Sequence, residues 1–423
     1  MKAIVTVGLG FGDEGKGATV DFLTRQMKAD LVVRYCGGAQ AGHNVELPDG
    51  RRHTFSQFGA GTFAGAQTYL GSRVIINPST LAPEAEHLQR LGVNSPRSLL
   101  TAHPNCLVAT AYHMAMNRMR EASRGDAKHG SCGLGIGETR HYWLRYGRDA
   151  VIANDLNHSD QLIDKLALLK DRLTLEMQSL PHHDLAAADS FHEVSPMEEA
   201  DCLINAFRGV SISSRIPDFQ FSIFEGSQGV LLDEYCGFHP YTTWSTVTAQ
   251  HAIEMLNEAG IGDFRTLGLT RAYATRHGDG PFPTACKAMT RALNDRGNPT
   301  NRYQGKIQAG PLDLVLLRYA GECVELDGIA VSHLDELPEE PQVCVRYEGL
   351  QRLPRPRQIC EQERLTQQLF SSHPVYSKIS REEVLERIDR IAPVVIQSNG
   401  PTWQDRKATQ DLWPTDSPRV LAK

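Results

Sequence analysis

A glycine-rich loop near the start of the chain constrains the fold more than any other feature. The loop, GLGFGDEGKG at residues 8–17, follows the apolar stretch KAIVTVG and precedes ATVDFLTRQM, which has the pattern of a helix. A short run that is apolar on both faces is typical of a strand buried in a parallel sheet. A second such run, DLVVRYCGG at residues 30–38, follows the helix. Strand, glycine loop, helix and strand form a βαβ unit, in which such a loop commonly binds phosphate.

The rest of the chain predicts an α/β fold around this unit. Further strand-like runs alternate with helical stretches, which favours a large, mainly parallel sheet covered by helices, in a P-loop-like nucleotide-binding fold. These runs are YLGSRVIIN, FQFSIFEG, RTLGLTRAY, GIAVSHLD and IAPVVIQSN. Residues 99–208 are mostly helical in pattern, with apolar residues three and four positions apart. We expect them to form a helical insertion. The length of 423 residues allows several average domains or one large domain with insertions.

The composition is that of an ordinary globular protein, with 41% hydrophobic and 22% charged residues. A net charge of -6 argues against nucleic acid as the main partner, because binding its backbone needs clustered Lys and Arg. The chain shows no apolar run of the roughly 20 residues that cross a bilayer and no signal-peptide pattern at its start, so we expect no membrane association and a cytoplasmic location. The cysteines lack CxxC or zinc-ligand spacing, which favours a reducing compartment.

Residues 10–16, GFGDEGK, match the GxxxxGK pattern of a phosphate-binding loop. Backbone N–H groups, the start of the following helix and a lysine would bind phosphate oxygens. The residues concerned are Gly12, Gly15, Lys16 and Gly17. Because Gly17 stands where a nucleotide hydrolase has the Ser or Thr that holds Mg²⁺, Asp13 is the nearest oxygen ligand. Alternatively, Asp13 and Glu14 are N-cap and first-turn acids that stabilise the helix by about 0.5–1 kcal/mol each. The loop glycines favour a functional role for Asp13, and both interpretations stay open for Glu14.

The loop resembles the GDEGKG signature that follows the first strand of adenylosuccinate synthetases. Other segments resemble motifs of that family in the same order, and they are RYCGGAQAGHN at residues 34–44, GSCGLGIG at 130–137, FEGSQGVLLD at 224–233, HPYTT at 239–243, TRHGDGPFPT at 275–284, SHLD at 332–335 and SNGP at 398–401. One such motif is weak, but the series is specific, so the chain is identified as a divergent member of that family. The resemblance spans nearly the whole chain and implies one synthetase-like domain over residues 1–423, with residues 99–208 as an insertion.

The resemblance implies an NTP-dependent ligase of purine nucleotide metabolism that works in two steps. The γ-phosphate of GTP is transferred to O6 of a nucleotide such as IMP, and the amine of aspartate then displaces that phosphate. The family pattern implies that Asp13 takes the N1 proton and ligates Mg²⁺, that His43 acts as an acid toward O6, and that the carbonyl of Gly42 is a second Mg²⁺ ligand. A lactam oxygen is a poor nucleophile until N1–H is removed, which explains the base and the acid on adjacent atoms.

Residues of the nucleotide-substrate site carry over from the family position by position. Gln40 stands where the family has Asn, and Cys132 replaces a phosphate-binding Thr, with Ser131 beside it as a stand-in. Gln228 and Thr243 match residues that contact the base and the phosphate. Arg145 aligns with an arginine that reaches the substrate phosphate of the neighbouring subunit, which implies a homodimer, although a simple surface role is the alternative.

The site for the phosphoryl donor also resembles that of the family, but its motif is altered. The family's Thr-Lys-Leu-Asp appears as SHLD, so that Asp335 can pair with the two adjacent donors of guanine. His333 replaces the lysine that packs along the base, which leaves ATP or dATP open as donors beside GTP. In the SNGP motif, Ser398 and Gly400 are implied to contact the donor.

The largest departure lies in the loop that binds the amino acid. The family has a cluster of arginines there, whereas this chain has NPTNRYQGKIQAGPLD at residues 298–313, which keeps only Arg302 and Lys306 as cations. His277 takes a nearby position where the family has a small apolar residue. Because Gln or Ile cannot replace a bidentate Arg-carboxylate pair, the ligated group is aspartate or another amine. Two alternatives stay open, a synthetase specific for a guanine nucleotide and a nucleotide-binding regulator without turnover.

Overall fold

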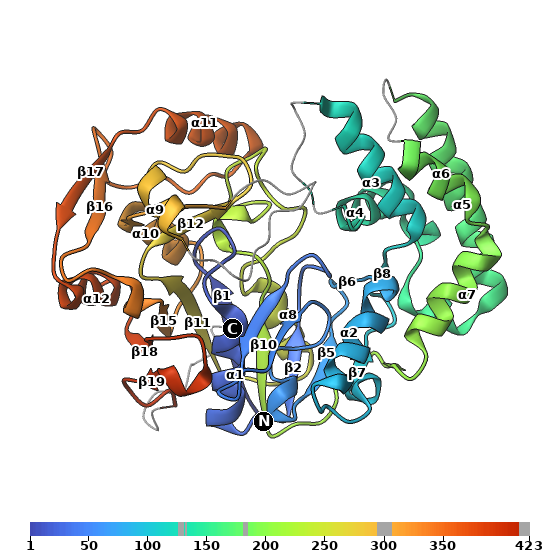
Figure 1. Cartoon of the computed structure of the whole chain (residues 1–423), viewed down its shortest axis with the longest axis horizontal. Helices are drawn as coiled ribbons and strands as arrows, with labels where there is room; N and C mark the ends of the chain where they lie inside the picture. Colours follow the sequence, from blue (N-terminus) through green and yellow to red (C-terminus); the bar gives the residue numbers. More distant parts are fainter. Residues whose placement is uncertain (126–130, 132, 181–184, 294–306, 414–423) are drawn as a thin grey trace.

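A ten-stranded sheet runs through the centre of the computed structural model, which describes residues 1–125, 131, 133–180, 185–293 and 307–413 (Figure 1). From edge to edge, its strands are β19 (Arg406–Ala408), β18 (Val394–Ser398), β15 (Gly328–Ser332), β11 (Phe264–Arg271), β1 (Lys2–Gly8), β10 (Phe221–Glu225), β2 (Leu31–Arg34), β5 (Gln67–Leu70), β7 (Leu100–Ala102) and β9 (Ser211–Ile212). All neighbours pair in parallel except β18 and β19. The predicted large, mainly parallel sheet is therefore confirmed.

Smaller sheets surround the main one. They pair β3 (His43–Glu46) with β4 (Arg52–Phe55), β6 (Ile75–Ile76) with β8 (Leu107–Val108), β12 (Ala274–His277) with β13 (Ile307–Gly310), and β16 (Gln342–Tyr347) with both β14 (Leu312–Asp313) and β17 (Pro374–Lys378). The apolar run at residues 69–77 forms two strands instead of the one predicted. A turn closed by Val74 N–H and the Gly71 carbonyl at 2.9 Å interrupts it, so β5 joins the main sheet and β6 does not.

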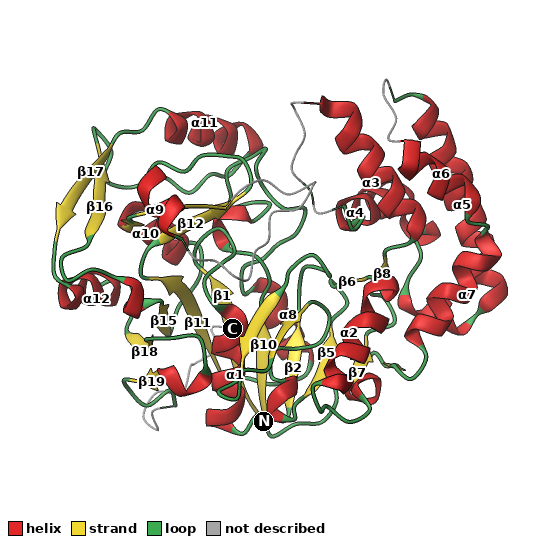
Figure 2. Cartoon of the chain, in the orientation of Figure 1, coloured by secondary structure: helices red, strands yellow, loops and turns green. Residues whose placement is uncertain are grey.

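Twelve helices lie within the described residues (Figure 2). They are α1 (Lys16–Met27), α2 (Pro78–Arg90), α3 (Ala111–Arg124), α4 (Ile136–Tyr146), α5 (Ser159–Gln178), α6 (Leu185–Glu193), α7 (Pro196–Phe207), α8 (Gln250–Glu258), α9 (Lys287–Ala292), α10 (Leu314–Glu322), α11 (Ile359–Phe370) and α12 (Arg381–Asp389). Local sequence explains several of their starts. Asn77 caps α2 with Pro78 as its first residue, and Ser195 and Glu198 form a capping box on α7. Over the described residues, no helix has both the length and the apolar character needed to span a bilayer.

The central strands are buried on both faces, and each face has its own hydrophobic core. Ile4 of β1 packs in one cluster together with Val20 and Leu23 of α1. Val5 and Val7 of β1 pack in the other cluster, against side chains of α8 and α10. This alternation follows from the period of two along a strand, and it explains why β1 is apolar at successive positions.

The helices α3 to α7 gather on one side of the molecule, at the right of Figure 1. Helix α5 buries Leu162, Leu166, Leu169 and Leu173, which recur at helical spacing and belong to the same core cluster as Ile4. Residues 99–208 thus contain these helices together with the short strands β7 and β8. Their status as an insertion in one domain stays a prediction.

The topology brings distant segments together at one edge of the sheet. Ligands of parallel α/β sheets bind beyond the carboxyl ends of the strands. Here that edge carries the loop after β1, the segments after β2 and β15, and the last residues of β10 and β11. Strand β10 lies between β1 and β2, with Glu225 in register with Thr6 on one side and Arg34 on the other.

Candidate active site

The glycine loop is closed around its own acid, Glu14. One carboxylate oxygen of Glu14 accepts hydrogen bonds from the backbone N–H groups of Gly10 and Gly12, at 2.9 and 2.8 Å. The other oxygen pairs with Lys16 Nζ at 2.7 Å, and this ammonium also donates to the Gly12 carbonyl at 2.6 Å. Both side chains are buried. Glu14 is therefore neither a helix cap nor a first-turn acid. It satisfies the loop's own donors and the charge of its lysine, so the N–H groups of Gly10 and Gly12 already have an anionic acceptor.

Helix α1 starts at the end of this loop without a side-chain cap. Its N-cap is Gly15, with a left-handed backbone (φ 79°) that favours glycine. A Cβ atom at Gly17 would lie 2.6 Å from the Asn44 carbonyl oxygen and 2.8 Å from the carbonyl carbon of His43. The position where a nucleotide hydrolase carries a hydroxyl must therefore stay glycine, because strand β3 with His43 fills the space.

Asp13 lies at the tip of the loop and is partly exposed. Its backbone carbonyl accepts a hydrogen bond from Nε of Arg271, the last residue of β11. Desolvation raises the pKa of the Asp13 carboxyl, whereas the positive charge of Arg271 lowers it. A raised pKa makes this carboxylate a stronger base.

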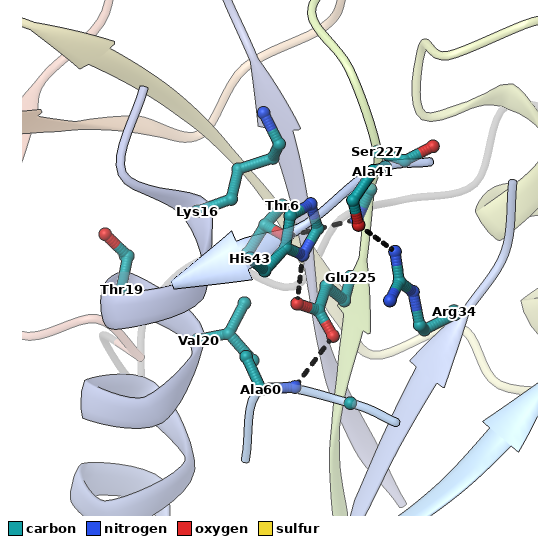
Figure 3. A network of polar contacts seen from close by, with 12 residues as sticks. Thr6, Lys16, Thr19, Val20, Arg34, Ala41, His43, Ala60, Glu225 and Ser227 are labelled. Atoms are coloured by element: carbon teal, nitrogen blue, oxygen red, sulfur yellow. Dashed lines mark hydrogen bonds and ion pairs between the residues drawn. The ribbon is translucent and has the colours of Figure 1, made fainter. Parts of the chain in front are cut away.

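His43 is held by a carboxylate from the centre of the sheet (Figure 3). Its Nδ1 lies 2.5 Å from Oε1 of Glu225, and Oε2 of Glu225 accepts from the Ala60 N–H at 3.1 Å. Arg34 lies next to this pair and donates to the Ala41 carbonyl at 3.3 Å. Both His43 and Glu225 are buried, and His43 Nε2 has no hydrogen-bond partner among the described residues. The pair thus fixes the ring and leaves Nε2 as the atom available to a ligand.

Burial decides the charge state of this pair in the ligand-free protein. Desolvation lowers the pKa of His43 to about 4, although Glu225 opposes the shift. Burial alone would raise the pKa of Glu225, but His43 and Arg34 outweigh burial and lower it. Glu225 is therefore ionised, and His43 is neutral at pH 7 with its Nδ1–H donated to the carboxylate. A ligand that brings negative charge would favour the imidazolium form.

Four of the residues expected to bind the substrate nucleotide line a single cavity of about 1690 Å³. Gln40, Gln228 and Thr243 lie on loops of the main body, whereas Ser131 faces them from the segment between α3 and α4. The cavity exceeds the roughly 300–1,000 Å³ of common small-molecule sites, so it has room for more than one small ligand. Its wall also includes the arginines Arg73, Arg120, Arg124, Arg140, Arg148 and Arg276.

Arg145 lies on α4, near its end, and its side chain is 56% exposed. It pairs with Glu176 of α5 at 2.7 Å and stacks over the ring of Tyr146 at 5.1 Å. Arg145 therefore lies at the surface, where it is accessible to a neighbouring subunit. Its role toward a second subunit stays a prediction.

The expected donor-site residues lie at the ends of the neighbouring strands β15 and β18. Asp335 is exposed, in a short helical turn that follows His333. His333 has a left-handed backbone (φ 60°), and its Nδ1 lies 2.8 Å from the Ser332 hydroxyl. Ser398 ends β18 and donates to the Gly400 carbonyl at 3.0 Å.

The predicted amino-acid site is described only in part. His277 ends β12 and lines the large cavity. Asp313, kept from the family motif, is buried and caps α10 by accepting from the N–H groups of Val315 and Leu316 at 3.0 and 3.1 Å. Arg302 and Lys306 lie outside the described residues, as does Cys132 of the nucleotide site.

The sequence analysis gave no role to Glu225 and Arg271, which contact His43 and Asp13. Glu225 falls within the quoted FEGSQG motif and is the only charged residue of a buried apolar strand, which was an available signal. Arg271 had no such signal, because its contact with Asp13 depends on how β11 packs beside β1.

The oxygen donors near the loop fit a magnesium ion. Mg²⁺ prefers oxygen ligands and commonly takes one or two carboxylates together with substrate phosphates. The described residues contain no cluster of three metal-ligating side chains. Asp13 and the Gly42 carbonyl would therefore hold the ion only together with phosphate oxygens, as expected for a metal that arrives with the donor.

Comparisons with known proteins agree on one family. The family model described as adenylosuccinate synthetase matches residues 5–389. An adenylosuccinate synthetase of Pseudomonas aeruginosa is 34% identical over 362 residues, which cover 82% of this chain and 81% of that protein. One from Alkalilimnicola ehrlichii is 33% identical over 367 residues, which cover 82% and 80%.

Solved structures share the fold at low sequence identity. The fully ligated adenylosuccinate synthetase of Plasmodium falciparum has a TM-score of 0.78 at 20% identity, covering 97% of this chain and all of that one. The succinoaminodeoxyadenylate synthetase of cyanophage S-2L, bound to dGMP and to dATP as an energy donor, has a TM-score of 0.59 at 18% identity, covering 96% of this chain and 95% of that one.

Proposed function

We propose, because the chain belongs to the adenylosuccinate synthetase family, that it phosphorylates O6 of an IMP-like nucleotide and then joins C6 to an amine. Family membership itself makes the chain a C–N bond-forming ligase of purine nucleotides. The observation that supports this two-step reaction is the contact between the loop that carries Asp13 and the strand that carries His43. They meet at Gly17, where a Cβ would lie 2.6 Å from the Asn44 carbonyl.

In the first step, Asp13 accepts the N1 proton of the 6-oxopurine. The electron pair released onto O6 attacks the γ-phosphorus, the bond from that phosphorus to the β-phosphate oxygen breaks, and the nucleoside diphosphate leaves. The raised pKa of Asp13 favours this proton transfer. A bound Mg²⁺, held by Asp13 and the Gly42 carbonyl, would neutralise phosphate charge.

In the second step, the amine attacks C6 and phosphate leaves with O6. The amine loses one proton as the C–N bond forms, and His43 Nε2 donates a proton or a hydrogen bond toward the departing oxygen. Glu225 holds Nδ1 and stabilises the positive charge that His43 then carries. Anionic substrates favour the imidazolium form that this role requires.

For the donor, we propose GTP, selected by Asp335. An exposed carboxylate at the end of β15 can accept from the two adjacent donors of guanine, a pattern that adenine lacks. His333 takes the place of a longer cation, so discrimination against ATP is weaker than an Asp-Lys pair would provide.

For the acceptor of the phosphoryl group, we propose a nucleotide that fills the cavity lined by Gln40, Ser131, Gln228 and Thr243. The amine is aspartate or another amino acid, whose carboxylates would meet the cavity arginines and His277. We further propose a homodimer in which Arg145 reaches the partner's cavity, and a cytoplasmic location.

The test is phosphate release from GTP or ATP with Mg²⁺, in the presence of IMP, GMP or dGMP, with and without aspartate. We expect release that depends on IMP and is completed by aspartate or by another amine in a screen. Dependence on GMP or dGMP instead would assign the guanine-specific reaction. Tight nucleotide binding without release under every combination would identify a regulator and refute the proposal.

A further inference from the structure

We propose that Arg271, Tyr273 and Glu336 form a positioning network that couples recognition of the donor base to the setting of the catalytic Asp13. The inference rests on the proposed function, in which Asp13 is the base and the donor base binds beside Asp335. It adds residues to which sequence reasoning gave no role. It also gives the segment at residues 332–336 a task beyond binding the base.

A continuous chain of hydrogen bonds joins the two sites. Nε of Arg271 donates to the backbone carbonyl of Asp13, and Nη1 donates to the hydroxyl of Tyr273 at 3.0 Å. That hydroxyl donates in turn to Oε2 of Glu336 at 2.7 Å. Tyr273 is buried and uses its oxygen both as acceptor and as donor, so it connects Arg271 to Glu336. Glu336 directly follows Asp335, the proposed base-binding residue.

A second connection runs beside the first. The Ser332 hydroxyl lies 3.2 Å from the Glu14 carbonyl and 2.8 Å from Nδ1 of His333. The ring of His333 meets that of Tyr273 edge to face, with centroids 5.8 Å apart. The segment at residues 332–336 therefore contacts the Glu14 carbonyl directly and is linked to the Asp13 carbonyl through Tyr273 and Arg271.

These two carbonyls belong to a part of the loop that needs external support. Gly12 (φ 118°) and Gly15 (φ 79°) flank Asp13 and Glu14, and glycine lets the backbone rotate more freely than other residues. The Glu14 carboxylate anchors the first half of the loop through Gly10 and Gly12. Arg271 and Ser332 hold the peptide units that follow, so a shift of the segment at residues 332–336 is transmitted to Asp13.

The test compares variants of the network in assays of monophosphate-dependent phosphate release. Arg271→Met removes both the charge and the hydrogen bonds, Arg271→Lys keeps the charge, and Tyr273→Phe breaks only the chain toward Glu336. Arg265→Met is the matched control, because Arg265 lies at the opposite end of the same strand. Thermal unfolding of each variant monitors folding, and Arg271→Lys keeps the test informative if Arg271→Met does not fold.

We expect Arg271→Met to lower kcat between about 10-fold and 100-fold. Arg271→Lys should lower kcat less. The second readout compares GTP with ITP, which lacks one of the two N–H groups of guanine that would donate to Asp335. Wild-type protein should show a lower kcat with ITP than with GTP. Tyr273→Phe should show the same kcat with GTP and with ITP.

A wild-type kcat in Arg271→Met, or a wild-type ratio of kcat for GTP over ITP in Tyr273→Phe, would overturn the network. Equal kcat for GTP and ITP in wild-type protein would overturn the coupling as well. Failure of the proposed function is distinguishable, because it is read from Asp13→Asn. If that variant turns over normally, Asp13 is not the base, whatever the Arg271 variants show.

Discussion

The substitution Glu225→Gln tests most directly how the site holds His43, the proposed acid. It keeps the size of the side chain and the acceptor for the Ala60 N–H, but removes the negative charge that lies 2.5 Å from His43 Nδ1. The neutral amide can donate to Nδ1, which would move the ring proton to Nε2 and oppose formation of the imidazolium.

The size of the effect follows from the contact that is lost. A hydrogen bond to a charged group contributes about 1.5–3 kcal/mol, and the pair is fully buried, so little of this is screened by solvent. If that energy stabilises the imidazolium in the transition state, its loss slows turnover between about 10-fold and 150-fold, at roughly 1.4 kcal/mol per tenfold.

The pH dependence gives a second, independent readout. Glu225 raises the pKa of His43 against the larger effect of burial. Because His43 must be protonated to act as an acid, activity falls as the pH rises through its pKa in the substrate complex. Glu225→Gln lowers that pKa, so the basic limb of the kcat profile moves to lower pH.

The assay is phosphate release from GTP with saturating nucleotide acceptor and amine, measured as kcat and KM across pH. Ser222→Ala is the matched control, since Ser222 is equally buried on the same strand and its hydroxyl has no hydrogen-bond partner among the described residues. Normal kcat and an unmoved basic limb in Glu225→Gln would refute the assignment of Glu225 as the residue that positions and charges His43.

Further substitutions and a pH titration test other parts of the site. Asp13→Asn should abolish turnover but leave nucleotide binding within a few-fold in calorimetry, and normal turnover would contradict its role as base. Glu14→Gln should lower the free energy of unfolding by about 3 kcal/mol in chemical denaturation, because it leaves the buried Lys16 without its anionic partner. An effect below 1 kcal/mol would mean that the loop does not need this ion pair. His333→Lys should raise the ratio of kcat/KM for GTP over ATP, since a lysine stem can pack along the base next to Asp335, and an unchanged ratio would argue against base contact at this position. The free energy of unfolding should fall by about 3 kcal/mol between pH 6.5 and 4, because unfolded protein binds a proton at His43 that the native state does not. His43→Gln should flatten this dependence, and an equally steep titration in that variant would assign it to other groups.

Much of the scaffold could be predicted from local pattern. The apolar run after Met1 became β1 with the predicted bounds, and the loop after it leads into α1 as expected. Within the stretch predicted to be mostly helical, Ser159–Gln178 became α5, because leucines at helical spacing can be buried together on one face. The run at residues 69–77 was predicted less well, since a turn at Gly71 directs its two halves into different sheets.

The sequence by itself determined which chemical groups are available: a glycine loop with Asp13 and Lys16, and His43 behind a second strand. Pattern and spacing suffice for these, because a strand, a glycine turn and a helix depend on neighbouring residues. The sequence also shows that the amino-acid loop departs from its family, although Arg302 and Lys306 lie outside the described residues.

Only the tertiary structure decided how these groups are held. Strand β10 is inserted between β1 and β2, and this order places Glu225 beside Arg34 and against His43, 182 positions away in the chain. The close packing of β3 on α1 explains why Gly17 must lack a hydroxyl. The ion pair between Glu14 and Lys16 explains why a phosphate-binding loop contains a second acid. Such contacts follow from the order in which strands pair, and that order is set by burial across the whole sheet and not by any local run of residues.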